Sequence, residues 1–187
     1  MYPLCGDFYM INQDRISEAL LFASIKHEGQ KMKQPDVSYV AHLQGVCLEA
    51  VGGCLNNKSD VNFEKVIMLA LLHDIIEDTH TTYEEVREKF GKEIADGVMA
   101  LTKNDSLKAE VKMKDSLRRI KEQGIEACIV KLADRLFNLK DIPSQWSENK
   151  VESYKEEAKL ILKELGFANE YMARRMKDKI EKYHCLL

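Results

Sequence analysis

The feature that most constrains this chain is an apolar run, residues 69–72, that leads directly into a histidine and three carboxylates, His73, Asp74, Glu77 and Asp78. At 3.6 residues per turn, the segment covers about two and a half turns of an α-helix. A carboxylate removed from water needs a partner, and a divalent metal ion can serve several at once. The alternative is an amphipathic helix with a solvated acidic last turn, although that turn would face the negative end of the helix dipole. The segment alone leaves both interpretations open.

Composition favours an all-α chain of ordinary globular type. The 187 residues include only nine glycines and three prolines, and no run alternates apolar and polar residues in the manner of a strand. This length suits one domain over residues 1–187, with a core at about 12–165 and a last helix at 168–184 packed on it. The five cysteines form no CxxC pair, which fits free thiols in a reducing compartment.

Charge and hydropathy exclude two classes of partner. A formal net charge of −3 carries no basic excess, so phosphate neutralisation does not support binding to polymeric nucleic acid. No apolar run approaches the roughly 20 residues that a membrane span requires, and no secretory signal pattern opens the chain. These features predict a cytoplasmic protein that does not bind membranes.

Helical periodicity predicts further elements around the central segment. Thr81 and Thr82 each precede a glutamate by three positions, a spacing typical of a capping box. His27 is interpreted as a surface or last-turn histidine of the first helix. The polar segment 29–38 is either a solvated linker or a lip that presents lysines to an anionic substrate. The predicted helices are residues 12–27, 39–55, 60–77, 83–90, 94–103, 108–123, 127–138 and 148–184, the last with a break at Gly166.

Two further polar residues stand out in apolar surroundings. His42 lies near the start of a predicted helix, where a histidine alone is more often a satisfied core residue than a ligand. Asp134 ends the apolar run 127–133, and an aspartate at that depth again needs a partner. With His73 and Asp74 they make a mixed nitrogen and oxygen donor set that suits Mn²⁺, Fe²⁺, Zn²⁺ or another first-row divalent metal. Such a site predicts hydrolysis of a phosphoester or pyrophosphate.

Four segments of the chain, taken in order, form a known pattern. They are His42, HDIIEDT at 73–79, FGKEIA and LTK within 90–103, and KLADRLFN at 131–138. This order resembles the signature of the HD superfamily of metal-dependent phosphohydrolases, whose fold is an all-α bundle. The second segment is similar to the HDxxEDT motif of RelA/SpoT-type (p)ppGpp hydrolase domains, and the third and fourth resemble the next two blocks of that family. The resemblance covers about residues 14–165.

The resemblance implies a metal site. His42, His73, Asp74 and Asp134 would bind one divalent metal, which is Mn²⁺ in that family, with Fe²⁺, Zn²⁺, Co²⁺ and Mg²⁺ as alternatives. We therefore expect the HD fold, an all-α bundle, with these four side chains close together in it.

The resemblance also implies roles beside the metal. Glu77 and Asp78 would form an acidic pair near the attacking water, with Glu77 favoured as proton acceptor and Asp78 as its orienting partner. Asn138 lies one helical turn after the last ligand and matches a position that contacts the nucleotide. Arg135 has two open roles, holding a phosphate or holding a structural carboxylate.

The chain departs from the family in the segment before His42. Family members carry an Arg-Lys pair there, whereas this chain has KMK at residues 31–33, so the predicted substrate contacts Lys31 and Lys33 lack a planar guanidinium that could stack on guanine. Asp141 stands where the family often has threonine. The metal ligands are intact, and the altered part is the segment expected to recognise the base.

These observations predict a stand-alone metal-dependent hydrolase that removes pyrophosphate from the 3′ position of guanosine polyphosphates, (p)ppGpp. Two alternatives stay open, a hydrolase of the same superfamily acting on another nucleotide or phosphoester and a catalytically silent nucleotide-binding sensor. The complete ligand set with its acidic pair argues against the sensor. A small-molecule nucleotide is the expected partner, and the chain is expected to be a monomer or a homodimer.

Overall fold

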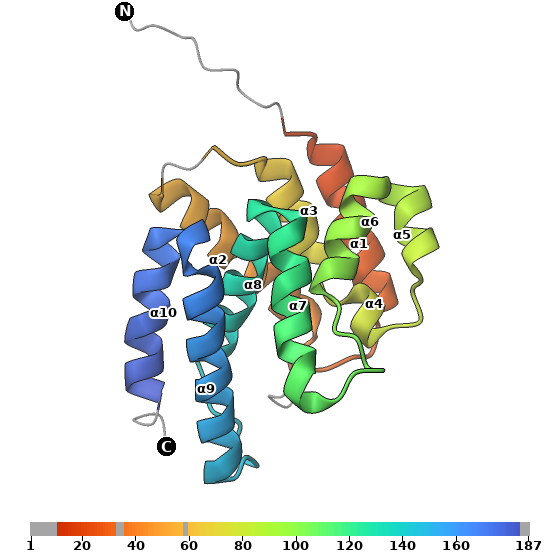
Figure 1. The fold of residues 1–187 in the computed structure, drawn as a ribbon. Helices are drawn as coiled ribbons and strands as arrows, with labels where there is room; N and C mark the ends of the chain where they lie inside the picture. Colours follow the sequence, from red (N-terminus) through yellow and green to blue (C-terminus); the bar gives the residue numbers. More distant parts are fainter. Residues whose placement is uncertain (1–10, 33–35, 58–59, 184–187) are drawn as a thin grey trace, which may run out of the picture.

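A computed structural model describes residues 11–32, 36–57 and 60–183, and helices dominate their regular structure (Figure 1). Strand-type pairing within those ranges is limited to an isolated antiparallel bridge between Lys31 and Ser38. The predicted all-α fold is confirmed. None of the helices described is both long and apolar enough to cross a membrane. In chain order the helices are α1 Gln13–Lys26, α2 Val40–Asn56, α3 Phe63–Leu72, α4 Ile75–Asp78, α5 Tyr83–Phe90, α6 Lys92–Leu101, α7 Ala109–Gln123, α8 Ile125–Asn138, α9 Glu148–Leu165, the 3-10 turn η1 Gly166–Ala168 and α10 Glu170–Lys182.

Side-chain caps fix several helix starts. The Asn12 side chain accepts hydrogen bonds from two backbone N–H groups of the first turn of α1, at 3.1 and 3.2 Å. The predicted capping box forms at the start of α5, where Glu85 N donates to Thr82 Oγ1 at 3.2 Å and Thr82 N donates to Glu85 Oε2 at 2.8 Å. Asn169 caps α10, which follows the break predicted at Gly166.

Helix α8 lies at the centre of the arrangement, and α2, α3, α7, α9 and α10 all pack against it (Figure 1). Every side chain from residue 127 to 136 is buried, charged ones included. Helix α2 approaches α8 closely because it carries a glycine at the contact: a Cβ on Gly45 would lie 2.0 Å from Phe137 Cε2. This approach brings the helix that carries His42 against the helix that carries Asp134.

The predicted helix over residues 60–77 is wrong at its start and is interrupted near its end. Helix α3 begins only after Asn62, whose side chain accepts a backbone N–H of the first turn at 3.0 Å. At the other end His73 Nδ1 lies 2.9 Å from the carbonyl oxygen of Ala70, and Asp74 takes φ −100° and ψ 0°. A single-turn helix, α4, then follows. Adjacent residues of a continuous helix point about 100° apart, so the interruption lets His73 and Asp74 face one centre.

The interpretation of His27 as a surface residue is wrong, although it does end α1. Its side chain is 1% exposed, and its ring stacks on Tyr39 with centroids 4.9 Å apart. Its Nδ1 lies 2.6 Å from Gln30 Oε1. The chain reverses at Gly29, which has φ 75°, and returns with Tyr39 over the imidazole. Local periodicity cannot report a contact made across such a loop.

Candidate metal centre and active site

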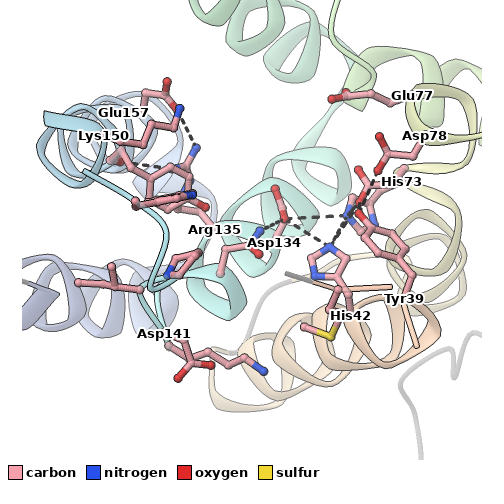
Figure 2. A pocket seen from close by; sticks show the side chains of 18 of the residues that line it. Tyr39, His42, His73, Glu77, Asp78, Asp134, Arg135, Asp141, Lys150 and Glu157 are labelled. Atoms are coloured by element: carbon pink, nitrogen blue, oxygen red, sulfur yellow. Dashed lines mark hydrogen bonds and ion pairs between the residues drawn. The ribbon is translucent and has the colours of Figure 1, made fainter. Parts of the chain in front are cut away.

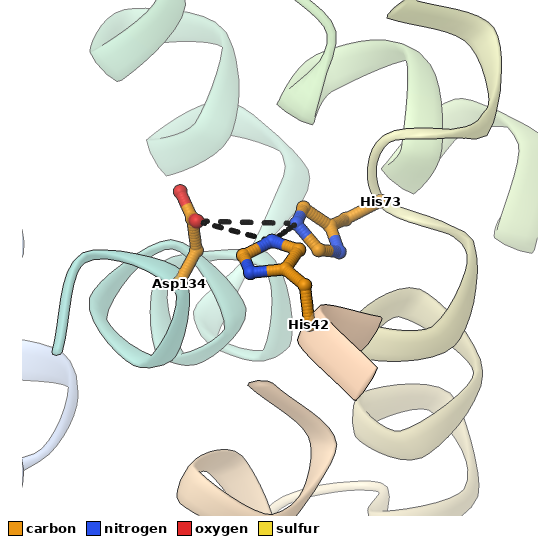
Figure 3. Close-up of side chains that lie close together, drawn as sticks. All are labelled: His42, His73 and Asp134. Carbon is orange, nitrogen blue, oxygen red and sulfur yellow. Dashed lines mark hydrogen bonds and ion pairs between the residues drawn. The ribbon is translucent and has the colours of Figure 1, made fainter. Parts of the chain in front are cut away.

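Three predicted ligands lie around one point and come from different parts of the fold. His42 belongs to the first turn of α2, His73 follows the last residue of α3, and Asp134 extends from α8 (Figure 3). His42 Nε2 lies 3.3 Å from His73 Nε2 and 3.7 Å from Asp134 Oδ1, and His73 Nε2 lies 4.0 Å from that oxygen. All three side chains are buried, and their donor atoms all lie within 4.8 Å of one another.

The fourth predicted ligand, Asp74, faces the same two imidazoles. Its Oδ2 lies 3.0 Å from His73 Nε2 and 3.4 Å from His42 Nε2. The hydroxyl of Tyr39 donates to this oxygen at 2.5 Å. The fold therefore gathers all four side chains that the sequence singled out, from positions far apart in the chain.

The donor chemistry fits a first-row divalent metal. His73 Nδ1 lies 2.9 Å from the Ala70 carbonyl oxygen, which can only accept, so Nδ1 carries a proton and Nε2 faces the centre. Two inward-facing imidazole nitrogens and two carboxylates are the ligands that Mn²⁺, Fe²⁺ and Zn²⁺ take in proteins. The site can accommodate one such ion, held by His42, His73, Asp74 and Asp134.

Burial and charge shift the acid–base equilibria of these groups. Burial opposes the charged imidazole of His73, but the carboxylates of Asp74 and Asp134 outweigh burial and raise its pKa to about 9. Burial likewise opposes the charged form of Asp74, and the His73 and His42 imidazoles overcome it and lower the pKa of that carboxyl well below its usual range. The site favours positive charge at its centre, which is the condition a dication satisfies.

Two neighbours on α8 hold the Asp134 carboxylate. Lys131 Nζ lies 2.9 Å from Oδ2, and Asn138 Nδ2 donates to Oδ1 at 2.6 Å. Burial opposes the charge on Asp134, but Lys131 and the His73 imidazole outweigh burial and lower its pKa. No role of Lys131 is predicted from the sequence, although this lysine is the one charged residue inside the apolar run 127–133. Asn138 lines the cavity as well, and its predicted contact with a nucleotide stays a prediction.

Glu77 and Asp78 both line the cavity near His73 (Figure 2), and they have different partners. Glu77 Oε1 lies 2.7 Å from Lys103 Nζ, and Glu77 Oε2 accepts from Lys103 N at 2.9 Å. Asp78 Oδ2 lies 3.0 Å from the Tyr39 hydroxyl oxygen, and burial together with the charge of Asp74 raises the pKa of Asp78. Burial opposes the Lys103 ammonium, but the Glu77 carboxylate outweighs it and raises the lysine pKa. Neither Tyr39 nor Lys103 has a role predicted from the sequence.

The candidate metal centre forms one end of a cavity of about 980 Å³. Lysines and aromatic rings line the other end, where Lys150 lies away from His73 and Glu77 (Figure 2). Trp146 and Tyr154 meet edge to face there, with centroids 4.9 Å apart. Aromatic faces beside ammonium groups suit a ligand that combines a ring with negative charge.

Arg135 lines this end of the cavity but is itself buried. Its guanidinium carbon lies 3.9 Å from the centroid of the Tyr154 ring, and its Nη2 lies 3.2 Å from Glu157 Oε2. Of the two roles left open by the sequence, the geometry supports the structural carboxylate. A phosphate contact of Arg135 stays a prediction.

The segment before His42 does not line the cavity through the residue predicted for it. Lys31 is exposed and lies outside the set of described residues that line the cavity, whereas its neighbour Met32 belongs to that set. Lys33 falls outside the described residues. Asp141, the departure noted after α8, also lines the cavity.

Fold and site together define a class of protein. A helical bundle with two histidines and two aspartates gathered at one end of a cavity is the arrangement of a metal-dependent hydrolase. The family model described as "HD domain" matches residues 19–170, and the chain belongs to this HD domain family. The superfamily predicted from the sequence is confirmed.

Several known proteins are similar to this chain over most of its length. A guanosine-3′,5′-bis(diphosphate) 3′-pyrophosphohydrolase of Danio rerio, MESH1, is 34% identical over 81% of this chain and 84% of its own, and the Homo sapiens protein of that name is 32% identical over 87% and 91%. The bifunctional (p)ppGpp synthase/hydrolase SpoT of Escherichia coli is 32% identical over 70% of this chain, which corresponds to 18% of SpoT. A solved structure of a metazoan ortholog of SpoT that hydrolyses ppGpp superposes with a TM-score of 0.78 at 28% identity, over 100% of this chain and 99% of that one.

Proposed function

We propose that this protein hydrolyses guanosine polyphosphates and releases the 3′-diphosphate as pyrophosphate. The observation that carries the proposal is the convergence of His42, His73, Asp74 and Asp134 at the base of a cavity of about 980 Å³, a volume that suits a nucleotide. The similarity to guanosine-3′,5′-bis(diphosphate) 3′-pyrophosphohydrolases supports the same reaction. We also propose that the protein is cytoplasmic, that it is a monomer or a homodimer, and that it acts on a small molecule.

The four convergent side chains would hold one divalent ion, and Mn²⁺ is the ion we propose. Such an ion, when bound, polarises a phosphoryl oxygen and activates water for attack. Lys131 and Asn138 contribute by orienting the Asp134 carboxylate from both sides. Tyr39 does the same for Asp74 through its hydroxyl. Fe²⁺, Zn²⁺, Co²⁺ and Mg²⁺ are the alternatives to compare in the assay.

The acidic pair supplies the proton chemistry in this proposal. Each Glu77 oxygen accepts one hydrogen bond from Lys103 and keeps a further lone pair, so the carboxylate can take the proton of the attacking water. Asp78 lies 3.0 Å from the Tyr39 hydroxyl oxygen and acts as the orienting partner. The Lys103 ammonium lines the same cavity and holds the Glu77 carboxylate in place.

The far end of the cavity would receive the nucleoside and its remaining phosphates. Trp146 and Tyr154 offer ring faces to a base, and Lys140 and Lys150 offer ammonium groups to phosphate oxygens. The predicted contacts of Lys31, Lys33, Arg135 and Asn138 belong to the same proposal and await variants at each position.

The test is an assay of the purified protein with Mn²⁺ and, separately, ppGpp, GTP, dGTP and a generic phosphodiester. We expect pyrophosphate from ppGpp and a product that keeps its 5′-diphosphate. The altered segment at residues 31–33 is the reason to include the other nucleotides, because turnover of one of them instead of ppGpp would assign a different substrate. Tight ppGpp binding without turnover of any compound would identify a sensor and contradict the proposal.

A further inference from the structure

The C-terminal end of α6 is held by an arginine that lies outside the cavity. Arg119, on α7, donates from Nη1 to the carbonyl oxygens of Met99 and Ala100 at 2.8 and 3.1 Å, and from Nη2 to that of Thr102 at 2.9 Å. Its Nε lies 2.8 Å from Asp115 Oδ2. The last carbonyls of a helix lack intrahelical partners, and a cation there also complements the helix dipole. One guanidinium therefore fixes the backbone on both sides of Leu101.

The residue after this fixed backbone is Lys103, which meets Glu77 twice. Its backbone N–H and its ammonium each hold a different oxygen of the Glu77 carboxylate, at 2.9 and 2.7 Å. Both residues line the main cavity and also a second groove of about 920 Å³, which Arg119 lines as well. The Lys103 side chain is 38% exposed, so packing constrains it little and its position depends on the backbone that carries it.

We propose that Arg119 is a positioning residue of the active site: by fixing the end of α6 it sets the place of Lys103, and through Lys103 the orientation of the Glu77 carboxylate. The inference rests on the proposed function. A reacting group displaced by about 1 Å can cost on the order of 100-fold in rate, so an anchor outside the cavity can control turnover without touching substrate.

The neighbouring arginine provides a matched control. Arg118 lies on the same helix, is 58% exposed, and pairs only with side chains of α7, Asp115 and Glu122, among the described contacts. It makes no hydrogen bond to α6 among those described. Substitution of Arg118 removes the same charge from the same helix while leaving the end of α6 held.

The experiment measures kcat, KM and Mn²⁺ affinity for the full chain with ppGpp in Arg119→Ala, Arg119→Lys and Arg118→Ala, and repeats Arg119→Ala in a Lys103→Ala background. We expect Arg119→Ala to lower kcat about 10- to 100-fold with KM and Mn²⁺ affinity within about twofold. Arg119→Lys should have an intermediate kcat, since an ammonium cannot span three carbonyls. Arg118→Ala should keep the wild-type kcat. In the Lys103→Ala background the ammonium contact with Glu77 is already lost and only the backbone N–H contact remains, so Arg119→Ala should cost clearly less than it does in the wild-type background.

Two results would overturn the inference. The first is a wild-type kcat in Arg119→Ala or, where that variant does not fold, in Arg119→Lys. The second is an equal loss in both backgrounds, which would show that Arg119 acts on stability in general and not through Lys103. Failure of the proposed function is a separate outcome, visible as absence of pyrophosphate release from the wild-type protein, and it would remove this inference as well.

Discussion

The two ends of the cavity differ in how their side chains are held. At the metal end, His42, His73 and Asp134 are buried and come from elements packed on or beside α8. At the other end, Lys140 and Lys150 are exposed and come from the loop after α8 and the first turn of α9. Packing fixes the first set before a ligand arrives, whereas a ligand must order the second. We therefore expect large effects from changes at the metal end and small ones at the lysine end.

The largest effect is expected from His73→Ala. The variant should lose Mn²⁺ binding, and its turnover should fall by about three orders of magnitude or more. Mn²⁺ should raise the Tm of the wild-type protein but not that of the variant. His80→Ala, at an exposed position nearby, is the matched control and should change neither. Metal analysis, thermal unfolding with and without Mn²⁺ and the ppGpp assay measure these effects. A His73→Ala protein that kept one Mn²⁺ and its activity would contradict the account.

Glu77→Gln separates the chemistry from the metal. The substitution should lower turnover by about two to four orders of magnitude, the range for loss of a general base, while Mn²⁺ affinity stays within about twofold. Exposed Glu88→Gln is the control. Full activity in Glu77→Gln would mean that another group takes the proton.

The pH dependence of stability tests the charge of the metal end. His73 has a pKa of about 9 in the folded protein, against about 6.5 in an unfolded chain. A group whose pKa is raised on folding contributes its full stabilisation at pH values below its pKa in the unfolded chain. This contribution is lost as the pH rises through its pKa in the folded protein. The free energy of unfolding of the chelated protein should therefore fall between about pH 6.5 and about pH 9. Urea unfolding across that range measures it.

Saturating Mn²⁺ is the control for this pH series. A bound ion requires the unprotonated imidazole, so the fall in stability between those pH values should disappear. A chelated protein whose stability stayed flat or rose with pH would show that His73 does not carry the shifted proton.

Gly45→Ala tests whether close packing sets the ligand geometry. A methyl group there would lie 2.0 Å from Phe137 Cε2, so α2 must move away from α8 or the ring must shift. We expect a loss of about 1–3 kcal/mol in the free energy of unfolding, with weaker Mn²⁺ binding. Gly52→Ala on the same helix faces open space and should stabilise by about 0.5–1 kcal/mol. Chemical unfolding and Mn²⁺ titration measure both, and equal effects would argue against the packing explanation.

Lys150→Ala is expected to have the smallest effect. An exposed ammonium contributes little to binding, so KM for ppGpp should rise about 3- to 10-fold while kcat stays within about twofold. Lys163→Ala, exposed on the same helix, should leave both unchanged. A large fall in kcat in Lys150→Ala would erase the difference between the two ends of the cavity.

The candidate ligands at the metal end could be predicted from the sequence because these polar residues stand out against apolar neighbours. His42, His73, Asp74 and Asp134 interrupt hydrophobic runs, and burial of such groups demands a common partner. The capping box of Thr82 could also be predicted, because its two partners lie within one helical turn of each other in the sequence. The single-domain boundaries stay a prediction.

The rest depends on contacts between residues far apart in the chain, which periodicity does not report. His27 reads as a helix end, and only the return of the chain at Tyr39 buries it. Arg119 reads as one of two solvated arginines, and only the place where α6 ends distinguishes it from Arg118. The break at His73 was hidden because both flanking segments favour a helix. Tertiary structure decides each of these cases.

The most direct test is a crystal structure of the protein grown with Mn²⁺, with anomalous diffraction recorded at the manganese absorption edge. The account predicts one strong anomalous peak in contact with His42 Nε2, His73 Nε2 and oxygens of Asp74 and Asp134. A peak elsewhere, or none at saturating Mn²⁺, would contradict it.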